Sequence, residues 1–303
     1  IFRKIGEPML QQLVNGLSLG SVYALLAHGY TMGNGIIKPT NLAHRDLYMM
    51  GAFMGYFLLN NLTFIGDGGT RFFIALILAM VGTAILGVVL EFLAYRPLRN
   101  STRIAALITA IGVSFFLEYT MIKFFSADVK AFPQAIEAVT FHLGPVSVTN
   151  IQLIILGVSL FLMIALQLIV KRTKMGKAMR AVSVDSDAAQ LMGINVNRTI
   201  SFTFALGSAL AGAAGVLLGL YYNQIEPLMG MTPGLKAFVA AVLGGIGIIP
   251  GAALGGFVIG IIETFTYVIS LDTFRDAIVY AVLIIILLVR PSGILGKNVK
   301  EKV

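Results

Sequence analysis

Apolar stretches close to the ~20 residues that cross a bilayer recur along the whole chain, and this repetition constrains the fold more than any other feature. They leave no room between them for a soluble domain of useful size. The composition agrees, because 57% of the residues are hydrophobic and only 12% are charged, against about 25% charged in a soluble domain. The sequence predicts an all-α, polytopic helical membrane protein, with one transmembrane domain over residues 1–303.

We expect eight or nine helices that span or half-span the bilayer. The seventh apolar segment is short for a complete crossing, and only the turn "IGIIPG" separates it from the eighth. This pair could therefore be a half-helix that enters the membrane and returns. The expected helices lie at 10–33, 47–61, 72–95, 104–125, 151–170, 200–222, 235–249, 250–270 and 275–290.

The basic residues gather in three connecting segments, 96–103, 171–198 and 290–302. By the positive-inside rule these segments are cytoplasmic, so the net charge of +8 reports topology rather than a nucleic-acid surface. Counting back places the N-terminus outside if the first helix is unbroken, although Arg3 and Lys4 argue against this. The connections expected on the opposite side hold few cations: Arg71, Lys123, Lys130, Lys236 and Arg275.

Glycines spaced four residues apart recur in five places, which indicates helices that approach each other closely in lipid. The pairs are at 16/20, 51/55, 215/219, 251/255 and 256/260. A further glycine-rich stretch, "AVLGGIGIIPG" at 241–251, is the best candidate for a broken helix beside a translocation path. A structural kink is the alternative. The residues that would make this break are Gly244, Gly245, Gly247 and Pro250.

Several chemistries are excluded or unsupported by the sequence. The chain has no cysteine, which rules out disulfides, thiolate metal sites and a cysteine nucleophile. No phosphate-binding pattern of the G-x-x-x-x-G-K-[ST] type occurs, and the nearest match, "SGILGKN" at 292–298, lacks both the spacing and the hydroxyl. Three dispersed histidines do not suggest a metal site. We therefore expect no catalytic residues, no metal and no cofactor bound by this chain.

The basic segment at 174–198 reads as two short helices. Asp185 can cap the second helix through its side-chain oxygen, and Gly193 can end it in a left-handed conformation. The second helix is expected to present an apolar ridge that needs a partner. The alternative is a helix that lies on the membrane surface. The ridge consists of Ala188, Ala189, Leu191 and Met192.

The run D-A-A-x-x-x-G that begins at Asp187 resembles the E-A-A-x-x-x-G loop by which bacterial ABC importer permeases dock onto their ATPase subunits. Other segments narrow the likeness: "NGLSLGSVYALLAHGYTM" (15–32), "EFLAYRPLR" (91–99), "KMGKAMRAV" (174–182), "GLKAFVAAVLGGIGIIPGAALGGFVIGIIE" (234–263) and "PSGILGK" (291–297). They resemble the branched-chain amino acid permeases of the first-subunit kind, the H component of the Liv system. The likeness extends over nearly the whole chain.

This resemblance implies one permease of a heterodimer in the bacterial inner membrane, in contact with membrane lipid and not with nucleic acid. It also implies a homologous second permease, two cytoplasmic ATPase subunits that use the ATP, and a periplasmic binding protein that delivers Leu, Ile or Val. Transport would follow ATP-driven alternating access. Two alternatives remain: a permease of the same family for urea or short amides, and a self-sufficient channel or secondary carrier.

The resemblance also assigns roles to residues. The cytoplasmic coupling loop would be 171–199, with Asp187, Ala188, Ala189 and Gly193 entering the ATPase. Within the membrane, Glu263 either bonds a neighbouring helix or lines the route, since a carboxylate there is costly. Two other acids, Glu91 near Arg96 and Glu118 near Lys123, read as structural pairs.

The stretch "NLAHRD" at 41–46 resembles the family's polar break, which usually reads N-F-A-H-G-[ED]. Asn41, His44 and Asp46 match it and are expected beside the translocation path. Arg45 stands where the family has glycine, and it could pair with Asp46 or a lipid phosphate, or it could alter the path. On this basis Arg45→Gly is expected to preserve or raise transport.

Overall fold

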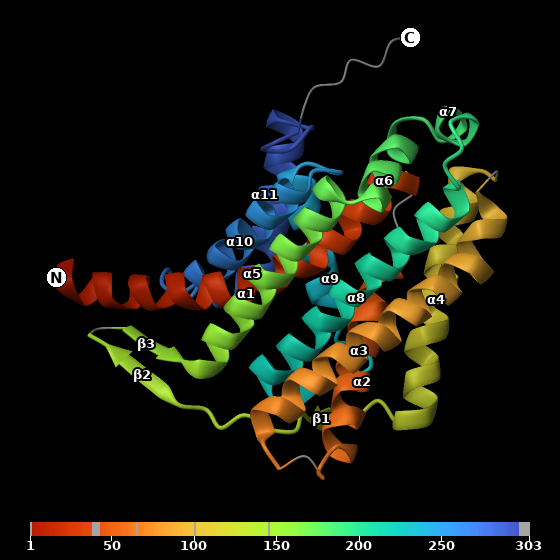
Figure 1. Ribbon diagram of the computed structural model, residues 1–303. Helices are drawn as coiled ribbons and strands as arrows, with labels where there is room; N and C mark the ends of the chain where they lie inside the picture. The colour runs from red at the N-terminus through yellow and green to blue at the C-terminus, as the bar shows by residue number, and fades with distance from the viewer. Residues whose placement is uncertain (1, 38–42, 65, 100, 145, 297–303) are drawn as a thin grey trace.

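The computed structural model describes residues 2–37, 43–64, 66–99, 101–144 and 146–296, and helices dominate it (Figure 1). Each apolar segment expected from the sequence overlaps a long helix, which confirms the all-α fold class. These helices are α1 (Phe2–Ile37), α2 (His44–Asn61), α3 (Gly68–Leu90), α4 (Arg103–Phe125), α5 (Asn150–Arg172), α8 (Val196–Tyr222), α9 (Met231–Gly244), α10 (Ile249–Phe265) and α11 (Arg275–Val289).

Four apolar helical segments of the described residues are long enough to cross a bilayer: Gly68–Leu98, Ile104–Phe125, Asn150–Arg172 and Val196–Tyr222. In contrast, α9 and α10 have 14 and 17 residues. Their rises of about 21 and 26 Å fall short of the ~30 Å hydrocarbon core. The two short helices pack against each other as a hairpin, as expected for a helix that is broken in this region.

Polar side chains cap the first turn of several helices. Asp67 caps α3 by accepting the Thr70 amide at 2.8 Å and its hydroxyl at 2.6 Å, and these hydrogen bonds lower the pKa of Asp67. Thr149 and Gln152 form a reciprocal capping box at the start of α5. Such caps satisfy amide groups that the first helical turn leaves free.

The bundle has two chemically different ends. The short helices α6 (Lys174–Val184) and α7 (Ser186–Leu191) stand at one end, and the hairpin of β2 (Thr140–Leu143) and β3 (Val146–Thr149) lies toward the other (Figure 1). A second strand pair, β1 (Lys130–Ala131) with β4 (Gln224–Ile225), also lies away from α6 and α7. Two of the cation-rich segments, 96–99 and 171–198, meet at the α6–α7 end. By the positive-inside rule this is the cytoplasmic end, called here the inner end, and the opposite one is the outer end.

Glycine seams hold the centre of the bundle. Helix α1 runs antiparallel to α10, with Gly16 and Gly20 packed on the backbone of α10 around Gly256 and Gly260. A methyl group added at Gly256 would lie 2.3 Å from the Ala24 Cα atom. The seam confirms the close helix packing that the glycine spacing predicted. The later turns of α1 pack against the start of α10, which lies at the inner end. Because α1 is one unbroken helix, its first residues therefore lie toward the outer end.

Two sequence expectations were wrong in detail. Helix α9 ends at Gly244 rather than near 249, because Gly245 and Gly247 take φ values of 108° and 86° that turn the chain. Lys236 and Arg275 were expected in outer connections. Lys236 instead lies in α9 with only 1% of its surface exposed. Arg275, the first residue of α11, does stand at the outer end.

The glycine seam between α1 and α10 yields the first testable prediction. We expect Gly256→Ala to lower the free energy of unfolding by about 1–3 kcal/mol, because the added methyl must push α1 away. Gly157→Ala is the matched control, since nothing lies within 4 Å of a methyl group at that helical position. Thermal unfolding of the two purified variants in the same detergent measures the difference. Equal melting temperatures would contradict the seam.

Candidate transport and coupling site

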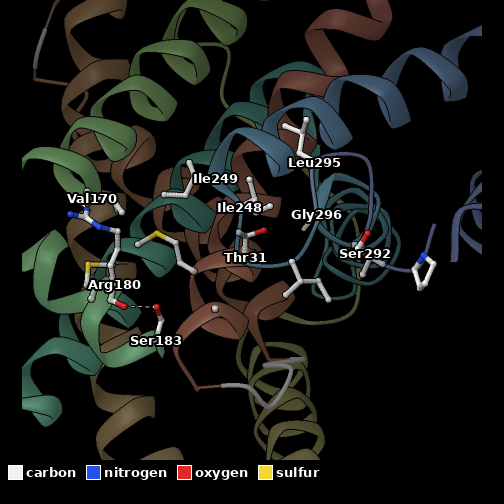
Figure 2. A pocket seen from close by; sticks show the side chains of 16 residues that line it. Thr31, Val170, Arg180, Ser183, Ile248, Ile249, Ser292, Leu295 and Gly296 are labelled. Atoms are coloured by element: carbon white, nitrogen blue, oxygen red, sulfur yellow. Dashed lines mark hydrogen bonds between the residues drawn. The ribbon is translucent and has the colours of Figure 1, made fainter. Parts of the chain in front are cut away.

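A cavity of about 960 Å³ opens at the inner end of the bundle. Figure 2 shows Ile248 and Ile249, from the turn between α9 and α10, on the same cavity as Arg180 and Ser183 of α6. Thr31 of α1 and the segment 291–296 that follows α11 line it as well. The structure thus brings the turn between α9 and α10, where a broken helix was expected, and α6, the first helix of the predicted coupling loop, to one cavity.

The four residues expected to break the helix have separate functions in this turn. A side chain at Gly244 would collide with the Gly251 carbonyl oxygen, 1.9 Å away, so this glycine lets the two helices touch. Gly245 and Gly247 reverse the chain. Pro250 lies in the first turn of α10, where its missing amide costs nothing. The result is a tight turn rather than a kink in one continuous helix.

The coupling segment forms two short helices, as predicted. The Asp185 carboxylate accepts the amides of Asp187 and Ala188, each at 2.9 Å, and so caps α7. At the other end Gly193 has φ +82°, and the amides of Gly193 and Ile194 donate to carbonyl oxygens of α7. This is the Schellman arrangement that ends a helix at a left-handed residue.

The exposed face of α7 differs from the predicted ridge in one residue. Ala189 is 5% exposed and packs inward beside Val182 and Phe204, so it does not belong to the ridge. Leu191 and Met192 are 89% and 83% exposed, and Asp187 and Ala188 are exposed beside them. A helix that covers one small apolar residue and presents two large ones is suited to contact another protein surface.

Helix α6 connects this face to the bundle. Its Gly176 packs on the carbonyl groups of Ile169 and Val170 at the end of α5, and the Arg180 guanidinium donates to the Val170 carbonyl. Met179 is buried on the bundle side of α6 and lines the inner cavity. Arg180 therefore has a structural role at the α5 terminus, whereas Lys177 is exposed.

The polar stretch at the start of α2 is buried among other helices. His44 and Asp46 are both buried, and the His44 ring meets the Tyr30 ring edge-on at 4.8 Å between centroids. His44 Nε2 and Asp46 Oδ2 have no hydrogen-bond partner among the described residues. Asn41, the other residue expected here, lies outside the described residues.

Arg45 contacts two carboxylates. Its Nη2 atom donates to Glu118 Oε1 at 3.2 Å and to Ser114 Oγ at 3.1 Å, both on α4, and its Nε atom lies 3.8 Å from Asp46 Oδ1. Glu118 is thus in a structural pair, as expected, but with Arg45 and not with Lys123. Arg45 connects α2 to α4 with its charge balanced by buried acids, so its replacement by glycine has a cost in stability. The expectation that Arg45→Gly preserves or raises transport stays a prediction.

A second charged cluster connects the three last helices near the outer end. Glu263 Oε1 of α10 lies 2.8 Å from Lys236 Nζ of α9 and 3.3 Å from Arg275 Nε of α11. Lys236 Nζ also lies 2.7 Å from Asp276 Oδ1. Glu263 additionally lines a second cavity, at the outer end. The bond to neighbouring helices considered for Glu263 is thus present, and its place on the translocation route stays a prediction. Sequence reasoning missed Lys236, although a lysine inside "GLKAFVAAVLGG" was the available signal.

Glu91 forms the third buried pair. It is 0% exposed, accepts the Ser201 hydroxyl at 2.6 Å, and pairs with Arg96 at 3.9 Å and with Arg99. The structural role predicted for this acid is confirmed. The contacts connect the π-helical turn Glu91–Tyr95 to the start of α8.

Together these features define a polytopic helical membrane protein with buried charges, a cavity at each end and an exposed apolar helix at its cytoplasmic end, the class to which membrane transport subunits belong. Comparison with known proteins agrees: the family model described as branched-chain amino acid transport system / permease component matches residues 12–287. The chain belongs to this family. No solved structure matches it.

Individual relatives cover the chain almost completely. The high-affinity branched-chain amino acid transport system permease protein LivH of Escherichia coli is 44% identical over 97% of this chain and 97% of its own length. The corresponding protein BraD of Pseudomonas aeruginosa is 42% identical over 97% of this chain and 98% of its own length. A probable LivH of Methanocaldococcus jannaschii is 28% identical over 99% and 96%.

The Arg45 contacts yield the second prediction. We expect Arg45→Gly to destabilise the protein by about 3–5 kcal/mol, because Glu118 and Asp46 would remain buried without their cation. The double variant Arg45→Gly with Glu118→Gln should recover part of this loss, since one uncompensated charge is removed. Melting temperatures of the two variants and of Glu118→Gln alone measure the coupling. An Arg45→Gly protein as stable as the wild type would refute the pairing.

Proposed function

We propose that the chain is one permease subunit of an ABC importer that moves branched-chain amino acids into the cytoplasm. It would pair with a homologous second permease and with two cytoplasmic ATPase subunits that hydrolyse the ATP, while a periplasmic binding protein delivers the substrate. The names of its relatives, which describe high-affinity transport of branched-chain amino acids, support this substrate class.

One observation carries the mechanism. The inner cavity is lined on one side by α6 and on another by the turn between α9 and α10. Only Asp185 separates α6 from the exposed helix α7. A force applied at α7 would reach the turn through residues that line the same cavity. This is the arrangement that an ATPase docked on α7 would need in order to open or close the inner end.

The docking surface would consist of Asp187, Ala188, Leu191, Met192 and Gly193. Ala189 would support it from beneath, through its contact with the cluster that includes Ile200 and Phe204. In this proposal the coupling loop, 171–199, belongs to the single transmembrane domain, because α6 packs directly on α5 and α8.

The translocation route would run between the outer and inner cavities. On α1, Tyr23 lines the outer cavity and Thr31 the inner one, so they are about 12 Å apart along the helix. The side chains between them are buried, and His44 and Asp46 lie beside this packed layer. Two cavities at opposite ends with a closed layer between them suit alternating access. Asn41 remains a predicted member of the route.

The docking surface yields the third prediction. We expect Leu191→Glu to weaken association with the ATPase subunits at least about tenfold, because an unpaired carboxylate in an apolar contact costs more than about 1.4 kcal/mol. Phe64→Glu is the matched control, since Phe64 is also exposed but lies in the outer connection between α2 and α3. Co-purification and ATP-dependent uptake in proteoliposomes measure both variants. Undiminished association of Leu191→Glu would exclude α7 as the docking helix.

The substrate class yields the fourth prediction. In proteoliposomes that contain the complete complex and the binding protein, we expect labelled leucine to accumulate only with ATP, and labelled urea not to accumulate. Uptake of urea in place of leucine would identify a permease for short amides. Uptake by this chain without ATPase subunits would identify a channel or secondary carrier. Each of these outcomes would overturn the proposed function.

A further inference from the structure

The outer cavity has a volume of about 310 Å³ and lies among α1, α2, α8, α9, α10 and α11. This volume is at the lower end of the ~300–1,000 Å³ typical of small-molecule sites. One wall is charged and carries the cluster around Lys236 and Glu263. Another wall is apolar, with Leu218, Ile225, Leu228, Met229 and Pro233.

The charged wall has an unused acceptor. Glu263 Oε1 accepts a hydrogen bond from Lys236 and forms an ion pair with Arg275 Nε at 3.3 Å, whereas Glu263 Oε2 has no hydrogen-bond partner at normal distance among the described residues. The Tyr23 hydroxyl, on the same cavity, also interacts with this carboxylate. The side chain is only 2% exposed. A buried carboxylate oxygen without a donor is unfavourable, so this atom favours a ligand that brings an N–H group.

The same wall has unused donors. The Lys236 ammonium has three N–H groups, and its two recorded partners are the carboxylates of Glu263 and Asp276. Helix α9 begins at Met231, after Gly230, without a side-chain cap and without an acid in its first turn. The amides of Met231 and Gly234 donate to Leu228 and Gly230, and Pro233 has no amide hydrogen, so the Thr232 amide is the donor left at this end. Thr232 and Pro233 of that first turn line the cavity. The uncapped start of a helix carries partial positive charge and favours a carboxylate.

We propose that the outer cavity is a transit site for the zwitterionic head of an α-amino acid. The substrate ammonium donates to Glu263 Oε2, and the substrate carboxylate accepts from Lys236 and the start of α9. The apolar wall receives the hydrocarbon side chain. This rests on the proposed function and adds to it, because the specificity for zwitterions then lies partly in this permease and not only in the binding protein.

The charge balance of the site supports a zwitterion over other ligands. Within the buried cluster Lys236 and Arg275 face Glu263 and Asp276, so two cations oppose two anions. Glu226, which is exposed, adds a third acid to the cavity lining and so a second place for the substrate ammonium. A ligand with a single charge would leave this cluster unbalanced. Urea carries no charge and would bind only weakly to either the cations or the carboxylates.

The absence of cysteine in the chain allows a direct test. Leu228→Cys places one thiol on the cavity wall of the assembled complex, and its alkylation is followed by mass spectrometry. Phe64→Cys, in the outer connection away from the cavity, is the matched control. At a leucine concentration of about twice the Kd, alkylation at residue 228 should slow about threefold, because the empty fraction is 1/(1 + [L]/Kd).

Analogues separate the two halves of the recognition. N-acetylleucine lacks the ammonium and leucinamide lacks the carboxylate, so neither they nor urea should protect residue 228 at the same concentration. Glu263→Gln, which removes the charge that holds the ammonium, should abolish protection by leucine. Residue 64 should react at one rate throughout.

The outcomes also separate this proposal from the proposed function. If the complex accumulates leucine with ATP but leucine leaves residue 228 unprotected, the transit site is wrong and the importer stands. Protection by N-acetylleucine or leucinamide equal to that by leucine would also overturn it, because recognition would then be apolar only. If the complex accumulates no leucine at all, the proposed function itself fails.

Discussion

The close approach of α1 and α10 is the contact on which the rest of the structure depends. In lipid no hydrophobic drive brings helices together, so their association relies on tight packing, and glycines allow the backbones to touch. Because α10 carries Glu263 near its outer end and follows the α9–α10 turn at its inner end, the seam fixes one wall of each cavity. Helix α1 supplies another wall at both ends, through Tyr23 and Thr31. The two cavities are therefore two ends of one packed helix pair.

Buried charges then attach the peripheral elements to this centre. Glu91 connects the end of α3 to α8, Glu118 connects α4 to α2, and Glu263 connects α10 to α9 and α11. Removing one partner from such a pair would leave an uncompensated charge in the membrane, so each pair also specifies which helices meet. Glu263 differs from the other two, because it lines the outer cavity.

The sequence predicted the features that depend on local physics. Hydropathy located the helices, and the cap at Asp185 and the left-handed residue Gly193 defined α7, because these depend on a few neighbouring residues. Features that depend on distant partners could not be predicted. Arg45 and Glu118 are far apart in the chain, and nothing near Arg45 indicates its partner. Lys236 looked like a loop residue because a hydropathy pattern cannot distinguish a buried ion pair from a break between helices. The inward orientation of Ala189 reflects its place in a cluster with residues of other helices, Phe204 among them.

Helix α9 connects the outer cavity to the inner cavity directly, through its own backbone. Lys236 lines the outer cavity and Val242 the inner one, about 9 Å apart on the same helix. The end of α9 is tied to α10 by the contact of Gly244 with Gly251, and to the segment after α11 by hydrogen bonds from Ile294 and Leu295. A displacement of the turn by α6 would therefore move α9 and α10 as one unit. Because that unit carries both Lys236 and Glu263, such a movement would reshape the outer cavity whenever the inner cavity changes. The opening of one cavity and the closing of the other would then need no further connection.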